Sequence, residues 1–297
     1  MREQDLRELV ETRALRPEAI AEAAAARRRP AGPLEDGRAF VIAADHTARN
    51  MLGAGERPHA MADRADMLDR VALALSRPGV TGVLGTPDVI EDLLLLGALD
   101  GKSVFGSMNR GGLSGAAWEI DDRFTAYDAA AIEAMGFEGG KMLTRIDVED
   151  PATAATVEAC GRTVGDLAAR GLIAMIEPFM ARRVDGRVRT DLSTEGAIRA
   201  SVIAAALGRT SAYTWLKVPV VEDMERVAAA TTLPTLLLGG EVAQDQDATF
   251  ERWGRALAAP NVVGLVVGRS LLYPPGDDVA AAVDAAAGLF PSGTAAA

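Results

Sequence analysis

Lysine is rare in this sequence. The 297 residues include 31 lysine and arginine side chains, and only three of these, Lys102, Lys141 and Lys217, are lysines, which leaves 28 arginines. The single cysteine, Cys160, excludes an internal disulfide and has no reactive motif around it, so we expect a buried, inert thiol. Aromatic residues make up only 4% of the chain and hydrophobic residues 49%. The core must therefore be built mainly from alanine, leucine and valine.

Long apolar runs and an excess of positive charge are absent as well. The longest runs, such as LLLLGAL, are far too short to cross a bilayer. The first thirty residues form a charged helical pattern without the apolar segment of a signal peptide. The net charge of −11 argues against nucleic acid or an anionic membrane as the main partner. We therefore expect a cytoplasmic protein, and its alanine-rich helices leave a homo-oligomer open.

Eight short apolar runs alternate with longer amphipathic segments. The runs cover residues 39–45, 80–86, 103–109, 141–147, 171–178, 213–220, 233–240 and 262–269. They are continuous rather than alternating, which is typical of parallel strands covered on both faces. Eight strand–helix units predict a (β/α)8 TIM barrel over residues 36–297, with an extra N-terminal helical segment over residues 1–35. A doubly wound open sheet is the alternative, but no G-x-G-x-x-G fingerprint follows the first strand.

Polar residues lie inside or at the ends of these runs, where a barrel has its active site. They are Asp45, His46, Asn109, Arg110, Lys141, Glu177, Lys217, Gly239, Gly240, Gly268 and Arg269. One interpretation of the charged members is structural, as ion pairs that fill the barrel. This interpretation weakens for the whole set, because burying several charges is costly and apolar replacements usually serve stability as well or better.

Lys217 lies within the apolar segment YTWLKVPVV. Arginine stays protonated in proteins, whereas a lysine amine becomes a nucleophile once burial or a neighbouring cation lowers its pKa. Two lysines and two carboxylates at one barrel mouth suit Schiff-base chemistry, in which Lys217 attacks a ketone and the charge of Lys141 favours the neutral amine. A carboxylate such as Glu177 would move protons. Pro178 follows directly, so we expect this strand to end there, with the carboxylate at the rim.

The last two runs end in Gly239-Gly240 and Gly268-Arg269. Barrels often bind phosphate through backbone N–H groups of the loops after strands seven and eight. Glycine permits close approach and arginine supplies charge, so these ends predict a site for a phosphorylated substrate. The two histidines, His46 and His59, form no metal-ligand pair, and we expect neither a metal ion nor another cofactor.

The segments AADHTARN, GGKMLTRID, IAMIEP, WLKVPV and VVGRSLL resemble the DeoC/LacD family of class I aldolases. The resemblance spans residues 36–275 and includes tagatose 1,6-bisphosphate and sulfofructose-phosphate aldolases. It implies a lyase in which Lys217 forms the imine, Lys141 assists it and Glu177 transfers protons. By the same resemblance, the strand-one aspartate, Asp45, belongs to the catalytic set, and the Gly-Arg pair of the eighth strand holds phosphate.

The substrate implied by the resemblance is less closely defined. LacD enzymes have a glutamine-arginine pair where this sequence has His46-Thr47. The sequence is more similar to an actinobacterial branch that accompanies inositol catabolism. Its implied substrate is 2-deoxy-5-keto-D-gluconate 6-phosphate, which is cleaved to dihydroxyacetone phosphate and malonate semialdehyde. Tagatose 1,6-bisphosphate, sulfofructose phosphate and deoxyribose 5-phosphate are the alternatives.

The leaving fragment of that substrate carries a carboxylate, which favours a planar bidentate partner. Arg49 and Arg110 follow strands one and three and are candidates, whereas Arg145 lies within a run and is less suited. We also expect His46 and Asn109 to contact the substrate. Two other functions stay open: a barrel that binds sugar phosphates without catalysis, and an enzyme that uses lysine as an acid without forming an imine.

Overall fold

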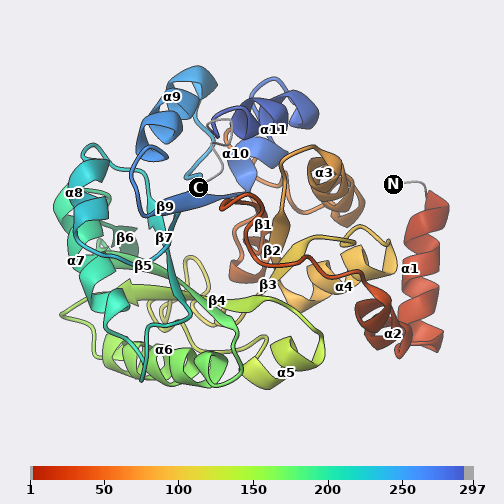
Figure 1. Ribbon diagram of the computed structural model, residues 1–297, viewed down its shortest axis with the longest axis horizontal. Helices are drawn as coiled ribbons and strands as arrows, with labels where there is room; N and C mark the ends of the chain where they lie inside the picture. Colours follow the sequence, from red (N-terminus) through yellow and green to blue (C-terminus); the bar gives the residue numbers. More distant parts are fainter. Residues whose placement is uncertain (1–2, 291–297) are drawn as a thin grey trace.

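Eight parallel strands close into a barrel in the computed structural model, which describes residues 3–290. The strands are β1 (Ala39–Ala44), β2 (Gly82–Gly85), β3 (Ser103–Ser107), β4 (Gly139–Ile146), β5 (Ile173–Val184), β7 (Thr214–Pro219), β8 (Thr235–Leu238) and β9 (Val262–Val267). Neighbours pair in the order β4-β3-β2-β1-β9-β8-β7-β5, and β4 pairs with β5 to close the ring (Figure 1). All eight predicted runs are strands, which confirms the (β/α)8 barrel.

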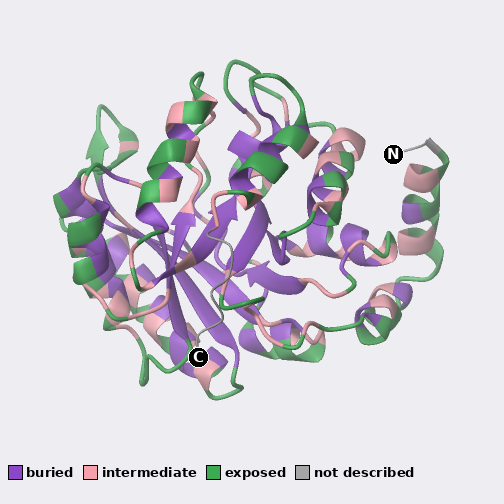
Figure 2. Ribbon diagram, turned by 45° about the horizontal axis from the view of Figure 1, so that its top comes forward, coloured by how far each residue is buried: buried purple, intermediate pink, exposed green. Residues whose placement is uncertain are grey.

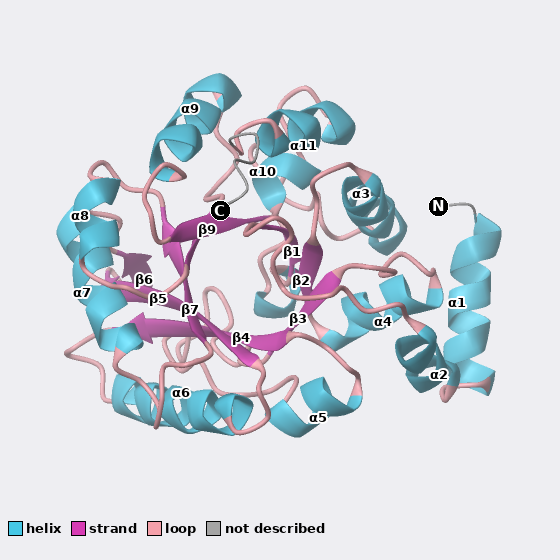
Figure 3. Ribbon diagram, viewed as in Figure 1, coloured by secondary structure: helices cyan, strands magenta, loops and turns pink. Residues whose placement is uncertain are grey.

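Helices surround the barrel and run back between its strands (Figure 3). They are α3 (Arg64–Ser76), α4 (Pro87–Leu95), α5 (Ala129–Ala134), α6 (Ala152–Ala168), α7 (Thr194–Ala205), α8 (Met224–Ala229), α9 (Gln246–Ala256), α10 (Arg269–Leu272) and α11 (Val279–Ala287), with a 3₁₀ turn η1 (Thr47–Arg49). Side-chain caps, which accept a backbone N–H bond in the first turn, fix where six helices begin. The caps are Asp63, Asp128, Ser193, Asp223, Asp245 and Asp278.

The strands have apolar side chains on both faces, as their continuous runs predict. In β1, Val41 and Ala43 belong to the cluster inside the barrel, whereas Phe40 and Ile42 pack under the helices. Figure 2 shows the result: buried strands at the centre and helices that are exposed only on their outer faces. The same alternation places Met175 and then Glu177 inside the barrel on β5. Apolar residues therefore fill the barrel near the amino ends of the strands. Charged residues follow on the same inward faces toward the carboxyl ends.

The fifth strand is longer than predicted. We expected it to end at Pro178, but β5 continues to Val184 and pairs with β4 as far as Met180. Its pairing with β7 ends earlier, at Ile176, so the missing N–H of the proline breaks no ladder there. The extension then forms an antiparallel hairpin with β6 (Arg187–Thr190). This hairpin stands above the barrel mouth and was missed from the sequence.

Two helices precede the barrel, α1 (Glu3–Leu15) and α2 (Ala19–Ala26), and they lie beside α4 (Figure 1). Arg27 directly follows α2 and is buried. Its guanidinium donates to the carbonyl oxygens of Lys102, at 2.5 Å, and Gly136, at 2.8 Å, and pairs with Glu138 at 3.4 Å. These groups precede β3 and β4, so Arg27 fastens the N-terminal helices to the end of the barrel opposite the strands' carboxyl ends. No helix among residues 3–290 is both long and apolar enough to span a membrane.

Candidate active site

The carboxyl ends of the strands surround a cavity of about 570 Å³. Its wall comes from most of the barrel strands, the loops that follow them, α9 and the β5–β6 hairpin. Six arginines line it: Arg49, Arg110, Arg145, Arg189, Arg252 and Arg269. Four acidic side chains oppose them: Asp45, Glu119, Glu177 and Glu241. The local charge is therefore opposite in sign to the net charge of −11, and the cavity suits an anionic ligand.

Glu177 links the two barrel lysines. Its Oε1 lies 2.5 Å from Nζ of Lys217, and its Oε2 contacts Nζ of Lys141. Lys217 comes from β7, Lys141 from β4 and Glu177 from β5 between them, so inward-facing positions on three neighbouring strands bring the groups together. The glutamate is thus within hydrogen-bonding reach of the Lys217 amine, and Lys141 reaches that amine through the shared carboxylate.

Asp45 holds the other side of Lys141. Its Oδ2 lies 3.1 Å from Nζ of Lys141, accepts from Oγ of Ser107 at 3.0 Å and is paired with Arg110. The Nε of Arg110 also donates to Ser107 Oγ at 2.8 Å. Ser107 was not predicted as a site residue, although it lies on the inward face of β3 at the carboxyl end of that strand. Arg110, a candidate for the substrate's carboxylate, is already paired within the protein.

The cluster contains more basic groups than acidic ones. Lys141, Lys217 and Arg110 are all nearly buried, and within residues 3–290 the only carboxylates paired with them are those of Asp45 and Glu177. Burial lowers the pKa of both lysines, and the charge of Arg110 lowers each further, although Glu177 acts in the opposite direction. The pKa of Glu177 is held well below its usual range by the two lysines despite its burial. The arrangement therefore favours an ionised glutamate and the loss of a proton from one amine.

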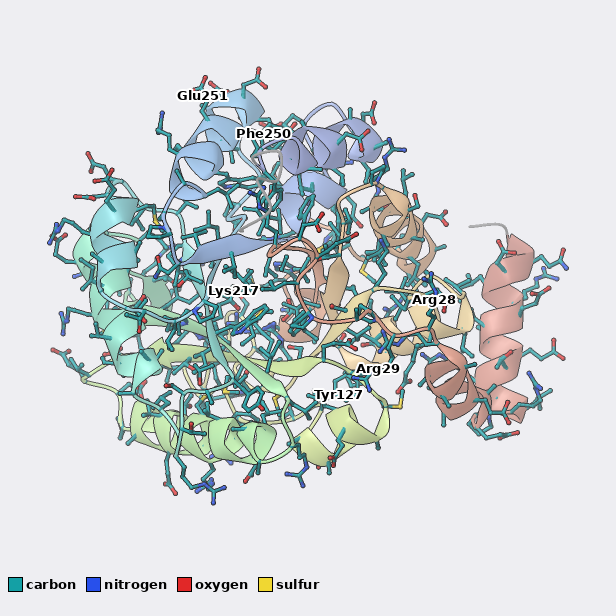
Figure 4. All side chains as sticks on the ribbon, viewed as in Figure 1. Arg28, Arg29, Tyr127, Lys217, Phe250 and Glu251 are labelled. Carbon is teal, nitrogen blue, oxygen red and sulfur yellow. The ribbon has the colours of Figure 1, made fainter. Side chains whose placement is uncertain are left out.

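Access to the cavity distinguishes the two lysines. The pKa is lowered for both amines, but the Lys141 side chain is 1% exposed and does not line the cavity. Lys217 lines the cavity wall and lies within the ring of helices (Figure 4). Both amines share Glu177, and of the two only Lys217 can meet a ligand in the cavity. The geometry thus leaves the Lys217 amine accessible from the cavity and the Lys141 amine behind its wall.

A second part of the cavity is lined by glycines at the ends of β8 and β9. Gly239, Gly240, Gly268 and Arg269 all contribute to the wall. In the described part of the chain, none of their backbone N–H groups has a hydrogen-bond acceptor. Four free donors beside a nearly buried guanidinium are suited to an anion, and we call these four residues the cradle.

Arg269 is nearly buried, and its guanidinium pairs with Glu241 at 2.6 Å and donates to the carbonyl oxygen of Gly53 at 3.3 Å. Glu241 was not predicted as a site residue. The side chain of His46 packs against Gly268, where an added Cβ would lie 2.7 Å from its Cε1. Burial and the charges of Arg269 and Lys217 keep the pKa of His46 well below its usual value, so the ring is neutral.

On the β3–β4 side of the cavity, Arg49 and Arg145 have different surroundings. Arg145 is bonded to both carboxylate oxygens of Asp122, at 2.6 and 2.8 Å, and also pairs with Glu119. Arg49 is 9% exposed, and its Nε donates to the carbonyl oxygen of Gly112 at 2.9 Å. Among residues 3–290 no carboxylate is paired with Arg49, and its pKa is lowered by burial and by the charge of Arg145. Arg49 therefore presents an uncompensated cation at the cavity.

The structure does not bring every candidate to the cavity. Asn109 is fully buried behind the wall, where its amide donates to the carbonyl oxygen of Leu143 at 2.5 Å and accepts from the Leu143 N–H at 2.7 Å. It braces β4 against the residues after β3. Cys160 is buried as expected. Within residues 3–290, no group of three or more His, Cys, Asp and Glu side chains has the geometry of a metal site.

Comparisons with known proteins agree with the barrel fold and identify proteins that are similar to this chain. The chain is 52% identical to Cgl0159 from Corynebacterium glutamicum, with a TM-score of 0.95 and 97% of each chain covered. A Schiff-base-forming fructose-1,6-bisphosphate aldolase superposes with a TM-score of 0.65 at 17% identity, covering 91% of this chain and 99% of the other. Fructose-bisphosphate aldolase from Slackia heliotrinireducens gives a TM-score of 0.60 at 16% identity, covering 86% and 87%.

The two aldolases show that this chain shares their fold. No curated protein matches the sequence significantly. The model of the Cgl0159-like family matches residues 37–287, which is most of the chain and nearly all of the barrel. Together with the similarity to Cgl0159 itself, this match shows that the chain belongs to the Cgl0159-like family.

Proposed function

We propose that the protein is a class I aldolase, an aldehyde-lyase that forms an imine on Lys217. The observation that carries this proposal is the buried cluster in which Lys141, Lys217 and Arg110 are balanced, in the described part of the chain, by two carboxylates, Asp45 and Glu177. A surplus buried cation favours deprotonation of an amine, and a neutral amine on the cavity wall is the nucleophile that imine formation requires. The fold shared with Schiff-base-forming aldolases supports the same chemistry.

The groups present suit each step of the cleavage. The Lys217 nitrogen adds to the ketone carbon, and loss of water gives a protonated imine that acts as an electron sink. Glu177, next to that nitrogen, takes the proton from the hydroxyl on the carbon β to the imine carbon. The bond between the α and β carbons breaks, the aldehyde leaves, and its electron pair moves into an enamine. Protonation of the enamine and hydrolysis release the second product and restore the amine.

The glycine cradle supports a phosphorylated substrate. Free N–H groups at Gly239, Gly240, Gly268 and Arg269 provide donors for phosphate oxygens, and the Arg269 guanidinium supplies charge. The ketone then lies between this cradle and Lys217, so the product that leaves the imine last is dihydroxyacetone phosphate. His46 is neutral and packs on Gly268, which supports a role in contacting the carbons between the two.

Arg49 supports a second anionic group at the other end of the substrate. Arg110 and Arg145 are paired within the protein, whereas Arg49 has no carboxylate partner among the described residues. A sugar acid phosphate fits this pattern better than a substrate whose leaving fragment is uncharged. Tagatose 1,6-bisphosphate and sulfofructose phosphate also leave an anionic fragment, and among these substrates we propose 2-deoxy-5-keto-D-gluconate 6-phosphate, in cytoplasmic myo-inositol catabolism. This proposal follows the resemblance to the inositol branch of the DeoC/LacD aldolases.

Trapping of the imine tests the proposal. Borohydride reduction in the presence of substrate should inactivate the protein and attach the ketone fragment to Lys217. Lys217→Arg should abolish both the adduct and the turnover, because a guanidinium does not form the imine. Lys102→Arg is the matched control: this lysine lies outside the cavity and donates to the carbonyl oxygen of Val80, so the adduct should persist. Turnover of Lys217→Arg within about tenfold of the parent, or ~1.4 kcal/mol of barrier, rules out the imine.

A side-by-side assay tests the substrate. The keto-deoxygluconate phosphate should have a higher kcat/KM than tagatose 1,6-bisphosphate, sulfofructose phosphate and deoxyribose 5-phosphate. A higher value for any of the other three substrates contradicts the inositol assignment and leaves the imine chemistry in place. Binding of sugar phosphates without turnover or adduct would instead indicate a non-catalytic barrel.

A further inference from the structure

Glu241 occupies an unusual position at the anion cradle. It follows Gly239 and Gly240 in the loop between β8 and α9, and its Oε1 lies 2.6 Å from Nη2 of Arg269. The side chain of Arg269 is 9% exposed, whereas that of Glu241 is 72% exposed. The buried cation at the cradle is therefore neutralised by a carboxylate that stands mostly in solvent.

Few contacts hold this carboxylate in place. In the described residues the pair with Arg269 is the only polar contact of the Glu241 side chain. The preceding Gly240 has a left-handed φ of +71°, and no atom lies within 4 Å of the position that its Cβ would take. The loop is thus not packed at this point, and the glutamate can leave Arg269 without breaking other interactions.

We propose that Glu241 is an internal substitute for the substrate's phosphate, bound to Arg269 when the cavity is empty and displaced when a phosphate monoester binds. This inference rests on the proposed phosphate cradle and goes beyond it by assigning a residue that sets affinity there. A phosphate near neutral pH carries more than one negative charge and three acceptor oxygens, whereas a carboxylate carries one charge. The phosphate can also use the free N–H groups of Gly239, Gly240 and Gly268, which Glu241 leaves without an acceptor.

The exchange has a consequence for specificity. An ion pair whose acidic partner is exposed contributes little to stability. Breaking the pair between Glu241 and Arg269 therefore costs phosphate only a moderate part of its binding free energy. A ligand with a single negative charge gains less from Arg269 and displaces Glu241 less well. Glu241 therefore lowers the affinity for all anions and favours dianions over monoanions, which also assists release of a phosphorylated product.

Calorimetric titration of inorganic phosphate into the full-length protein tests the proposal. Glu241→Gln should bind phosphate about threefold to tenfold more tightly than the parent at low ionic strength, and the gap should narrow as salt is added. Glu251→Gln makes the same change of net charge on the exposed outer side of α9, away from Lys217 (Figure 4), and should leave the affinity unchanged. In an Arg269→Gln background, Glu241→Gln should give no gain in phosphate affinity, because the guanidinium for which Glu241 and phosphate compete is gone.

Equal or weaker phosphate binding by Glu241→Gln overturns the proposal, since Glu241 would then support Arg269 rather than compete with the ligand. A gain that persists in the Arg269→Gln background also overturns it. Absence of phosphate binding in the parent and in Glu241→Gln overturns it together with the phosphate cradle. Borohydride trapping reports on Lys217 independently, so the amine chemistry can be judged separately from either result.

Discussion

Glu177 is the residue on which the charge balance of the site depends. It pairs with Lys217 at 2.5 Å and with Lys141, and all three side chains are nearly buried. Both lysine pKa values are depressed, so between those values and the ordinary 10.5 the folded protein binds fewer protons than the unfolded chain. Stability therefore rises with pH across that window.

Glu177→Gln should move the pH window in which stability rises to lower pH. Removing the counter-ion leaves two buried amines without a carboxylate between them, at a cost of about 3–5 kcal/mol in unfolding free energy near neutral pH. The deficit should narrow as pH rises through the parent's native lysine pKa values, because the amines are then neutral in both proteins. Urea unfolding across a pH series measures this. A deficit that grows with pH would show that Glu177 does not balance the amines.

Arg49 should determine selectivity for the far end of the substrate. Arg49→Gln removes the uncompensated cation while retaining a donor toward Gly112, so the site should remain assembled. We expect KM for substrates with an anionic leaving fragment to rise about tenfold to a hundredfold, which corresponds to about 1.5–3 kcal/mol for a charged hydrogen bond. Substrates with a neutral leaving fragment should change by less than about twofold. Equal losses on both kinds of substrate would remove Arg49 from this role.

Among the elements, β1 and β9, the first and last strands of the barrel, pair closely at a glycine, Gly264. A Cβ at Gly264 would overlap the carbonyl oxygen of Ala39 on the paired strand. Gly264→Ala should therefore lower the unfolding free energy by about 3 kcal/mol or more, because two paired backbones have to separate.

Gly254 on α9 is the matched control for this substitution. Its Cβ would meet only Leu289 Cδ2, at 3.8 Å, which is an ordinary contact. Gly254→Ala should raise stability by about 0.5–1 kcal/mol, as expected for alanine in a helix interior. Thermal unfolding of both variants gives the comparison, and similar effects at the two sites would contradict the packing argument at Gly264.

Some elements form from residues close together in the sequence and others depend on distant contacts. This difference decided which of them could be predicted. The eight strands were found because each is a local apolar run between amphipathic helices. The β5–β6 hairpin was not predicted because a proline within an apolar run, here Pro178, usually marks the end of a strand. Its Asp185-Gly186 turn, with φ of 49° and 74°, was a readable signal, since a two-residue turn with both φ positive favours Asp-Gly.

The site residues were found by a similar local rule, since polar residues at strand ends are visible in the sequence. Their partners were not visible. Arg49, Arg110 and Arg145 looked alike in the sequence, and only the fold shows that Asp45 and Asp122 pair with two of them. Asn109 likewise bonds to the backbone of Leu143, a contact between the segment after β3 and strand β4 that no spacing in the sequence specifies.

For the whole molecule, the N-terminal helices are attached at the opposite end from the cavity. Arg27→Gln should lower the unfolding free energy by about 3 kcal/mol, because a buried guanidinium with several acceptors is lost. Activity at moderate temperature should be retained, since none of these contacts lines the cavity.

Arg28→Gln is the neighbouring control for Arg27 and should be nearly silent, because Arg28 is exposed (Figure 4). Thermal unfolding combined with steady-state kinetics separates the two effects. Loss of kcat/KM in parallel with stability for Arg27→Gln would show that the N-terminal helices also organise the active site.

The placement of the lysines makes the protein a simple target for covalent labelling. Two of the three ε-amines lie in the barrel, and the third, Lys102, is half-buried and donates to the carbonyl oxygen of Val80. Acylation and reductive methylation modify most proteins at many surface lysines, whereas here Lys102 is the only side-chain amine outside the barrel. A carbonyl reagent shaped for the cavity would meet a single amine there, that of Lys217, and would label the protein once, at that residue.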